Sequence, residues 1–202
     1  MQKQKLTGRD LEFLYEIGTL RFIPRSWSRF LNPDYQNLAE HHFRVVWIAL
    51  IIAAREGVEN TEKIVKLALM HDVAESRTGD ADYLSRQYVE RNEDLGMKDI
   101  FKDTALEQEF LELWKEYSAK KSLEAKIVKD ADNLDVDFEI KEQEAKGDKS
   151  GVGWKKQRNE VMKKRFFTPT AKEMWYAIQK SDPHDWHYKG RNRFNGGDWK
   201  QK

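Results

Sequence analysis

The segment LALMHDVAESRTGD, residues 67–80, starts as an apolar helix and then presents a histidine and two acids within five residues. His71 and Glu75 are four residues apart and share a helix face, and Asp72 and Glu75 are three apart. Either this is a helix end whose polar side chains enter the solvent, or the side chains form a site. Spacing alone leaves both interpretations open, because a single His-Asp pair is a weak signal.

Two adjacent histidines, His41 and His42, lie near the start of an apolar stretch that begins at Leu38. Periodicity does not choose between them, because His41 shares a helix face with Val45 and His42 shares one with Val46. The simpler interpretation is one core histidine, hydrogen-bonded to the backbone, and one at the surface. The whole chain has only five histidines, so histidines in apolar helices call for an explanation.

A fourth residue of interest, Asp132, lies in the segment IVKDADNLDVDF, residues 127–138. It is four residues from a valine on either side, so it is predicted to touch the apolar side of a helix. Asp130 and Asp137 are predicted to face the solvent. A buried carboxylate is costly unless it is paired or binds a metal. Lys129 is one turn before Asp132 and could pair with it or reach a phosphate.

Considered together, these residues suggest a metal site. Taken alone, either of the adjacent histidines and any single aspartate of residues 127–138 is more often structural than a ligand, and the His71-Asp72 pair is undecided. In combination, two imidazoles and two carboxylates form a mixed nitrogen and oxygen set that suits a divalent cation such as Mn, Co, Fe, Ni, Zn or Mg. The candidate ligands, in chain order, are His41, His71, Asp72 and Asp132.

Composition narrows the class of protein. With 202 residues the chain is long enough for one well-buried domain. Lys and Arg number 36 against 35 Asp and Glu, so no basic surplus indicates a nucleic-acid partner. Cysteine is absent, which excludes disulfides, thiolate ligands and cysteine nucleophiles. No apolar run reaches membrane-spanning length and the N-terminus does not resemble a signal peptide, so a cytoplasmic location is expected.

The hydrophobic pattern predicts an all-α protein without internal repeats. Helices are expected at about residues 7–20, 38–53, 62–74, 106–117, 122–144 and 170–179. Breaks are expected at 22–33 and 147–153, and residues 81–104 have no clear pattern. Trp114 and Trp175 are predicted to lie in the core. We expect one domain, residues 1–182, followed by a tail, 183–202, that is disordered or packed on the surface, in which His184 and His187 are structural rather than ligands.

Several segments together resemble the HD-domain superfamily of metal-dependent phosphohydrolases, and within it the 5′-deoxynucleotidase-like family. The segment MHDVAESRTGD resembles the family block H-D-x-x-E-x-x-x-G-D, and VKDADNLD resembles its K-x-A-D-x-L segment. LAEHH resembles the family's A-E-H segment and selects His41 over His42. LRFIPRSW resembles an N-terminal segment in which an arginine and a nearby tryptophan contact the substrate. The resemblance covers about residues 7–145.

The resemblance implies an HD-domain helical bundle with the metal between the central helices, His41, His71, Asp72 and Asp132 being the ligands. It also implies a reaction, the release of phosphate from (deoxy)nucleoside 5′-monophosphates by a metal-activated water. Glu75 would position or deprotonate that water, or join Asp80 around a second metal. Arg25 would clamp the phosphate. Further substrate contacts would come from Trp27, Asp72, Asp80 and Lys129. A homodimer is expected, because family members commonly form one.

Alternatives remain at this stage. An HD protein could instead hydrolyse a cyclic nucleotide, a triphosphate or an alarmone, or it could bind nucleotides without turnover. A plain helical interaction protein would bind no metal at all. The sequence also departs from the family in two places: Ser26 separates Arg25 from Trp27, and the loop after Asp80 continues as Ala81-Asp82-Tyr83. The preference for deoxyribose or ribose is therefore left open.

Overall fold

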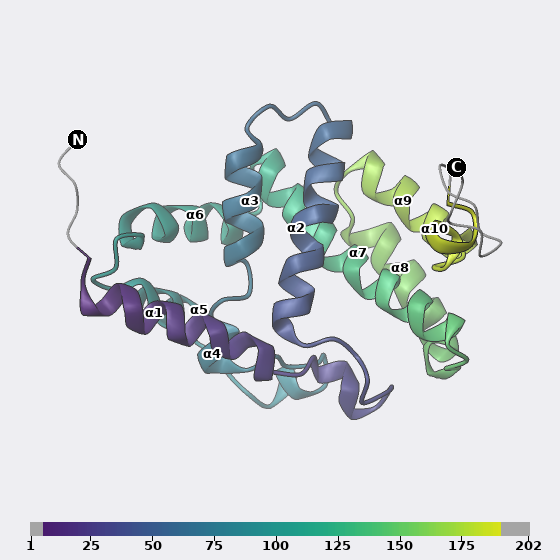
Figure 1. The fold of residues 1–202 in the computed structure, drawn as a ribbon, viewed down its shortest axis with the longest axis horizontal. Coiled ribbons are helices and arrows are strands. Elements are labelled where there is room, and N and C mark those ends of the chain that lie inside the picture. Colours follow the sequence, from purple (N-terminus) through teal and green to yellow (C-terminus); the bar gives the residue numbers. More distant parts are fainter. Residues whose placement is uncertain (1–5, 191–202) are drawn as a thin grey trace, which may run out of the picture.

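The computed structural model describes residues 6–190, and within this range all regular secondary structure is helical (Figure 1). The α-helices are α1 Gly8–Gly18, α2 Leu38–Arg55, α3 Thr61–Met70, α4 Glu75–Thr78, α5 Glu93–Phe101, α6 Glu107–Ala119, α7 Leu123–Ala145, α8 Lys155–Arg165, α9 Pro169–Lys180 and α10 Asp185–Tyr188. Four 3-10 helices complete the chain: η1 Thr19–Phe22, η2 Ser26–Arg29, η3 Ser85–Gln87 and η4 Ser150–Trp154. The predicted all-α class is confirmed.

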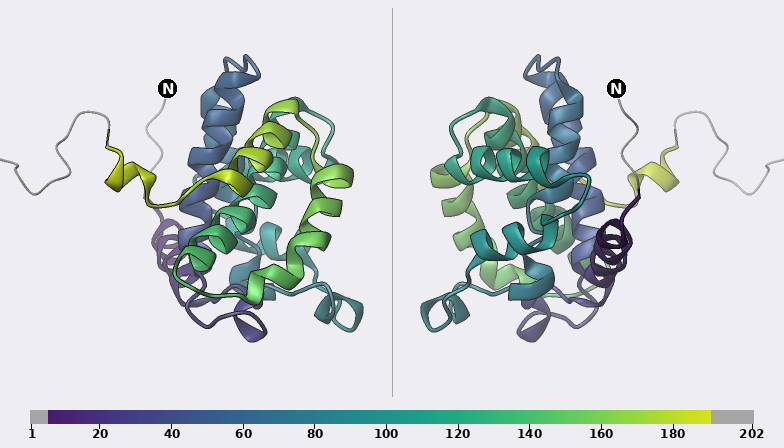
Figure 2. Two further views of the ribbon diagram at one scale, coloured as in Figure 1. Left: turned by 90° about the vertical axis from the view of Figure 1, so that its right-hand side faces the viewer. Right: turned by 90° about the vertical axis from the view of Figure 1, so that its left-hand side faces the viewer.

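Three helices form the centre of the bundle. α2 packs against both α3 and α7, and α3 also packs against α7 (Figures 1 and 2). α2 begins at a capping box, in which Asn37 accepts a hydrogen bond from the backbone N–H of Glu40 and Glu40 accepts one from that of Asn37. This cap fixes the start of α2, and the two adjacent histidines follow directly at the end of its first turn and the beginning of its second.

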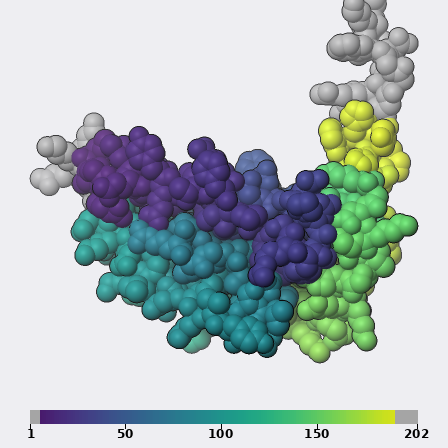
Figure 3. Space-filling model, turned by 90° about the horizontal axis from the view of Figure 1, so that it is seen from below, coloured from purple at the N-terminus to yellow at the C-terminus, as the bar shows by residue number. Residues whose placement is uncertain are grey.

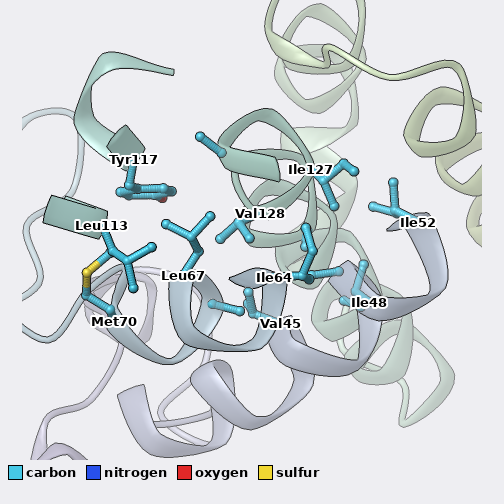
Figure 4. Packing of buried hydrophobic residues seen from close by; sticks show 14 of the residues in the cluster. Val45, Ile48, Ile52, Ile64, Leu67, Met70, Leu113, Tyr117, Ile127 and Val128 are labelled. Carbon is cyan, nitrogen blue, oxygen red and sulfur yellow. The ribbon is translucent and has the colours of Figure 1, made fainter. Parts of the chain in front are cut away.

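The core lies where α2, α3, α6 and α7 meet (Figure 4). Residues that line it include Val45, Ile48 and Ile52 from α2, Ile64, Leu67 and Met70 from α3, Leu113 and Tyr117 from α6, and Ile127 and Val128 from α7. Burying an aliphatic side chain of this size contributes about 1.5–3 kcal/mol. The core therefore holds rigidly the three helices that carry the histidines and aspartates of interest. Trp114 and Trp175 are buried in the same core, as predicted.

The prediction that Asp130 and Asp137 face the solvent is wrong, because both side chains are buried. Asp130 accepts hydrogen bonds from the backbone N–H groups of Phe167 and Thr168, at 2.9 and 2.8 Å, and from the Thr168 hydroxyl at 2.7 Å. Asp137 accepts two from Arg158 of α8. α7 is thus covered by α2 and α3 on one side and by the C-terminal helices on another.

Replacing Asp130 with alanine should lower the free energy of unfolding by about 2–4 kcal/mol, because it leaves the buried N–H and hydroxyl of Thr168 and the partly buried N–H of Phe167 without their acceptor. Chemical denaturation measures this change. Glu112→Ala, on the exposed face of α6, is the matched control and should unfold like the wild type. If both variants had the same midpoint, Asp130 would not hold the start of α9 in place.

Other boundaries differ from the prediction in detail. The helix expected at 62–74 ends at Met70, and a turn separates it from α4. The indistinct segment 81–104 contains η3 and α5, and the loop expected at 147–153 contains most of η4. α8 was not predicted. Residues 191–202 of the expected tail lie outside the described residues, so the division at 182 stays a prediction. None of the helices within residues 6–190 combines the length and hydropathy that crossing a bilayer needs.

Candidate metal centre

Four side chains from the central helices converge at one point. His41 comes from the first turn of α2, His71 and Asp72 come from the turn that follows α3, and Asp132 comes from the middle of α7. One nitrogen or oxygen atom from each lies within 4.8 Å of the others. The structure therefore brings together all four residues that the sequence singled out as ligands.

The spacing of these atoms fits one divalent cation. His41 Nε2 is 3.2 Å from His71 Nε2, 3.4 Å from Asp132 Oδ1 and 3.6 Å from Asp72 Oδ2. Donors that bind a common ion at about 2.1 Å lie about 3.0–3.4 Å apart at octahedral or tetrahedral angles. Two imidazoles and two carboxylates at this separation match the donors that Mn, Co, Fe, Ni or Zn accept.

Hydrogen bonds of the Nδ1 atoms orient both histidine rings toward this centre. His71 Nδ1 lies 2.8 Å from the carbonyl oxygen of Ala68, and His41 Nδ1 lies 2.5 Å from Oδ2 of Asp135. A carbonyl and a carboxylate only accept, so each Nδ1 donates, and each Nε2 is the ring nitrogen that would bind a cation. Asp135 also accepts a hydrogen bond from Gln36 and pairs with Arg44. Asp135 was missed by the sequence prediction, although it follows Asp132 by one helical turn.

Without a cation, the cluster holds protons in its place. Burial and Arg25 lower the pKa of His41, yet the carboxylates of Asp135 and Asp132 raise it to about 10. Burial raises the pKa of Glu75, and the charges of Asp72 and Asp80 add to this, to about 9. Both groups therefore hold protons in the folded, metal-free protein at pH values where they would be deprotonated in the unfolded chain.

Metal binding should therefore stabilise the protein more at high pH than at neutral pH. His41 and Glu75 have ordinary pKa values of 6.5 and 4.5, so between pH 6.5 and about 9 the folded metal-free protein holds more protons than the unfolded chain. Its free energy of unfolding falls as the pH rises through this window. A cation replaces those protons, so the rise in Tm on adding excess Mn²⁺ to chelator-treated protein should be larger near pH 9 than near pH 6.5. An equal rise at both would contradict this.

Arg25 is buried beside the centre. Its Nη1 is 3.7 Å from Asp72 Oδ2 and its Nε is 3.2 Å from Asp80 Oδ2. Asp80 also accepts a hydrogen bond from the backbone N–H of Ser26 at 2.9 Å, which ties the N-terminal segment to the end of α4. Within residues 6–190, neither Nε nor Nη1 has a partner in hydrogen-bonding geometry. The guanidinium thus presents donors next to the four ligand atoms.

Glu75 lies at the start of α4 and lines a cavity of about 400 Å³ next to the centre. His71, Asp72 and Lys129 line the same cavity. Oε1 of Glu75 accepts a hydrogen bond from Arg91 at 2.9 Å, and Oε2 has no partner among the described residues. Arg91 also donates to the carbonyl of Gly79 at 2.7 Å. The sequence prediction missed Arg91, which lies in the segment where no pattern was found.

The remaining candidate residues lie around the same centre. Lys129 donates a hydrogen bond to Oδ2 of Asp132 at 2.5 Å, so the pairing expected from their spacing is present. Trp27 follows Arg25 by two residues and is mostly buried. His42 is also buried, but it packs against the ring of His71 and is not one of the four converging residues. Burial and His71 keep the pKa of His42 well below its ordinary value, so it is neutral.

An all-α bundle with a His, His-Asp, Asp centre between its central helices defines a class of proteins, and the comparison with known families agrees. The family model described as HD domain matches residues 17–175. The chain belongs to the HD-domain family, as its resemblance predicted.

Relatives place the chain more narrowly. It is 35% identical to the 5′-deoxynucleotidase HDDC2 of Danio rerio over 147 residues, which cover 70% of this chain and 72% of that protein. It is 33% identical to the same-named protein of Homo sapiens over 140 residues, 66% and 68% of the two chains. Among solved structures, a conserved hypothetical protein from Pyrococcus furiosus has a TM-score of 0.69 and 26% identity, covering 85% of this chain and 99% of that one.

Proposed function

We propose that this protein is a metal-dependent 5′-deoxynucleotidase, which hydrolyses (deoxy)nucleoside 5′-monophosphates to nucleosides and phosphate. The observation that carries the proposal is the centre itself: four converging ligand atoms with a buried arginine on one side and a carboxylic acid of raised pKa on another. The relatives named 5′-deoxynucleotidase support the substrate class.

The roles follow from the positions of the side chains. His41, His71, Asp72 and Asp132 would hold one divalent cation, which lowers the pKa of a water and offsets negative charge on the phosphoryl group. Arg25 would donate to the phosphate oxygens through the donors that Asp72 and Asp80 leave incompletely satisfied.

Glu75 would accept the proton of the attacking water, because its Oε2 has no partner among the described residues and its side chain lines the cavity beside the four ligands. Lys129 would neutralise Asp132 and lie within reach of the phosphate. Asp80 would accept a hydrogen bond from the sugar 3′-hydroxyl. Since Glu75 and Asp80 are each paired with an arginine, we assign no second cation to them.

One assay tests the proposed function. The purified protein is stripped with chelator, Mn²⁺, Co²⁺, Mg²⁺ or Zn²⁺ is added back, and phosphate release is measured. The panel holds deoxy- and ribonucleoside 5′-monophosphates, cyclic nucleotides and nucleoside triphosphates. We expect release from monophosphates that depends on the added metal. Hydrolysis of cyclic nucleotides or triphosphates only would overturn the proposal, as would bound metal with no release from any nucleotide.

We further propose that the protein is a homodimer that pairs through the outer face of α2. Phe43, Trp47 and Ile51 recur at four-residue spacing, and each is more than half exposed. A helix that is apolar all round is normally buried on all sides. If two copies pair antiparallel about Trp47, Phe43 meets Ile51 and Glu40 lies near Arg55 of the other copy. A cytoplasmic location and the absence of a nucleic-acid partner stay predictions.

Trp47→Glu should convert the dimer to a monomer, because it places a charge at the centre of the apolar stripe on both copies. Sedimentation at micromolar concentration measures the mass. Tyr15→Glu, at an exposed position of α1, is the control and should leave the dimer intact. A wild-type protein that sediments as a monomer would contradict the proposal.

A further inference from the structure

An aromatic cluster forms around Trp27, two residues after Arg25, and includes Trp154, which the sequence prediction did not single out. Trp27 is its middle. The ring of Trp154, from η4, lies 4.7 Å from that of Trp27, and the rings of Tyr83 and Phe30 lie 5.8 and 6.2 Å from it. Trp154 and Phe30 are also in contact, at 5.7 Å. These four residues are called the aromatic cluster below.

Two members of the cluster are close in sequence to Arg25 and Asp80. Trp27 follows Arg25 by two residues, and Tyr83 follows Asp80 by three. Arg25 and Asp80 are paired, and Arg25 also approaches the ligand Asp72. The cluster is therefore tethered to the residues that would bind the phosphate and the sugar. In Figure 3 the dark-blue segment with Trp27 adjoins the green segment that follows α7.

Aromatic surface of this cluster is open to a ligand. Trp27 is 9% exposed and lies beneath the other rings of the cluster, whereas Phe30 and Tyr83 are 54% and 48% exposed. Trp154 is half-buried. The exposed rings, rather than that of Trp27, are the ones that a ligand can touch. A substrate contact by Trp27 itself stays a prediction.

The position of Trp154 is fixed by contacts other than Trp27. Gly151 packs so closely on Ile140 of α7 that a Cβ there would lie 2.6 Å from the isoleucine. Asp148 accepts hydrogen bonds from Ser150 and from Asn32 of the N-terminal segment. η4 is thus anchored on both sides. A ring held in this way loses little conformational entropy when it binds a flat ligand.

We propose that Trp154 and Tyr83 form the stacking wall for the nucleobase of the substrate, and that they determine the preference for nucleotides over phosphate esters that have no base. This inference rests on the proposed function. Stacking on an aromatic ring suits any base, because every base has a π face. The wall would add affinity for the nucleoside part without touching the phosphate.

Two substrates separate this role from a structural one. A deoxynucleoside 5′-monophosphate and 2-deoxyribose 5-phosphate share the sugar and the phosphate and differ only in the base. For Trp154→Ala we expect the KM of the nucleotide to rise about tenfold, with kcat nearly unchanged and the kinetics of 2-deoxyribose 5-phosphate unaltered. Trp154→Phe should restore most of the affinity, and Tyr83→Ala should act like Trp154→Ala. Trp186→Ala, at an exposed site on α10, is the control.

Calorimetry measures the affinity of the same variants for both phosphate esters. The difference in affinity reports the contribution of the base, even if the wild type turned over neither ester. In that case the proposed function would fail, while loss of nucleotide binding in Trp154→Ala alone would still support the wall. Equal losses for both esters would show that Trp154 only supports the fold. A wild type that binds both equally, or variants that bind the nucleotide normally, would also overturn the inference.

Discussion

Replacing Asp72 with alanine should remove metal binding and phosphate release together. Oδ2 of Asp72 lies 3.3 Å from His71 Nε2 and 3.6 Å from His41 Nε2, so it is part of the proposed ligand set. Losing even an outer partner of a metal ligand costs about 10–100-fold in affinity, and a direct ligand should cost more. The same side chain approaches Arg25, so its loss also frees the guanidinium from one of its two carboxylates.

Metal content by elemental analysis and phosphate release are both measured on the variant. Asp99→Ala, at an exposed site on α5, is the control and should retain metal and turnover. Circular dichroism checks that the helices persist. A folded Asp72→Ala protein that binds one equivalent of metal with the affinity of the wild type would remove Asp72 from the ligand set.

Glu75→Gln should retain the metal and lose most of the turnover. The amide has nearly the shape of the acid, and its oxygen can still accept the hydrogen bond from Arg91. It cannot take a proton, and loss of a general base typically lowers kcat about 10²–10⁴-fold. Metal content should stay at the wild-type level, because Glu75 is not one of the four converging residues.

The pH profile distinguishes a base from a merely supporting residue. Burial, with Asp72 and Asp80, keeps Glu75 protonated at low pH, so wild-type turnover should rise with pH as this proton is lost. The variant has no such proton and should lack that limb of the profile. If Glu75→Gln turned over like the wild type, or kept the same pH dependence at a lower rate, Glu75 would not be the base.

The central helices could be predicted because each has one strongly apolar face. α2, α3 and α7 carry aliphatic residues at helical spacing, and these residues form the core that was expected. α8 could not be predicted in this way. Its sequence, KKQRNEVMKKR, has no apolar period, and only Arg158 and Met162 are buried. A helix whose main anchor is an ion pair leaves no periodic hydrophobic signal.

The aspartates of α7 show that the apolar face of a helix does not predict which polar residues on its other faces are buried. Asp130, Asp132, Asp135 and Asp137 lie within eight residues, and all four are buried. The spacing of Asp132 from the apolar residues of α7 predicted that it is buried. The same spacing carries no information on the segment before α9 and on Arg158, which cover the opposite face of α7. Burial of Asp130 and Asp137 therefore depends on partners far along the chain.

Candidate ligands were easier to predict than the residues that support them. The four candidate ligands stand out because they interrupt apolar helices: His41, His71, Asp72 and Asp132. The family resemblance then assigns each of them a place in one metal site. Asp135 looks like its neighbours in the sequence, and Trp154 belongs to none of the motifs that the sequence prediction used. Their positions follow from packing between distant segments, which no local pattern records.

The most direct test of the metal centre is anomalous X-ray scattering from crystals grown with Mn²⁺. We predict one strong anomalous peak enclosed by the side chains of His41, His71, Asp72 and Asp132. No peak between these four residues in a crystal of active, manganese-loaded protein would contradict the assignment of the centre.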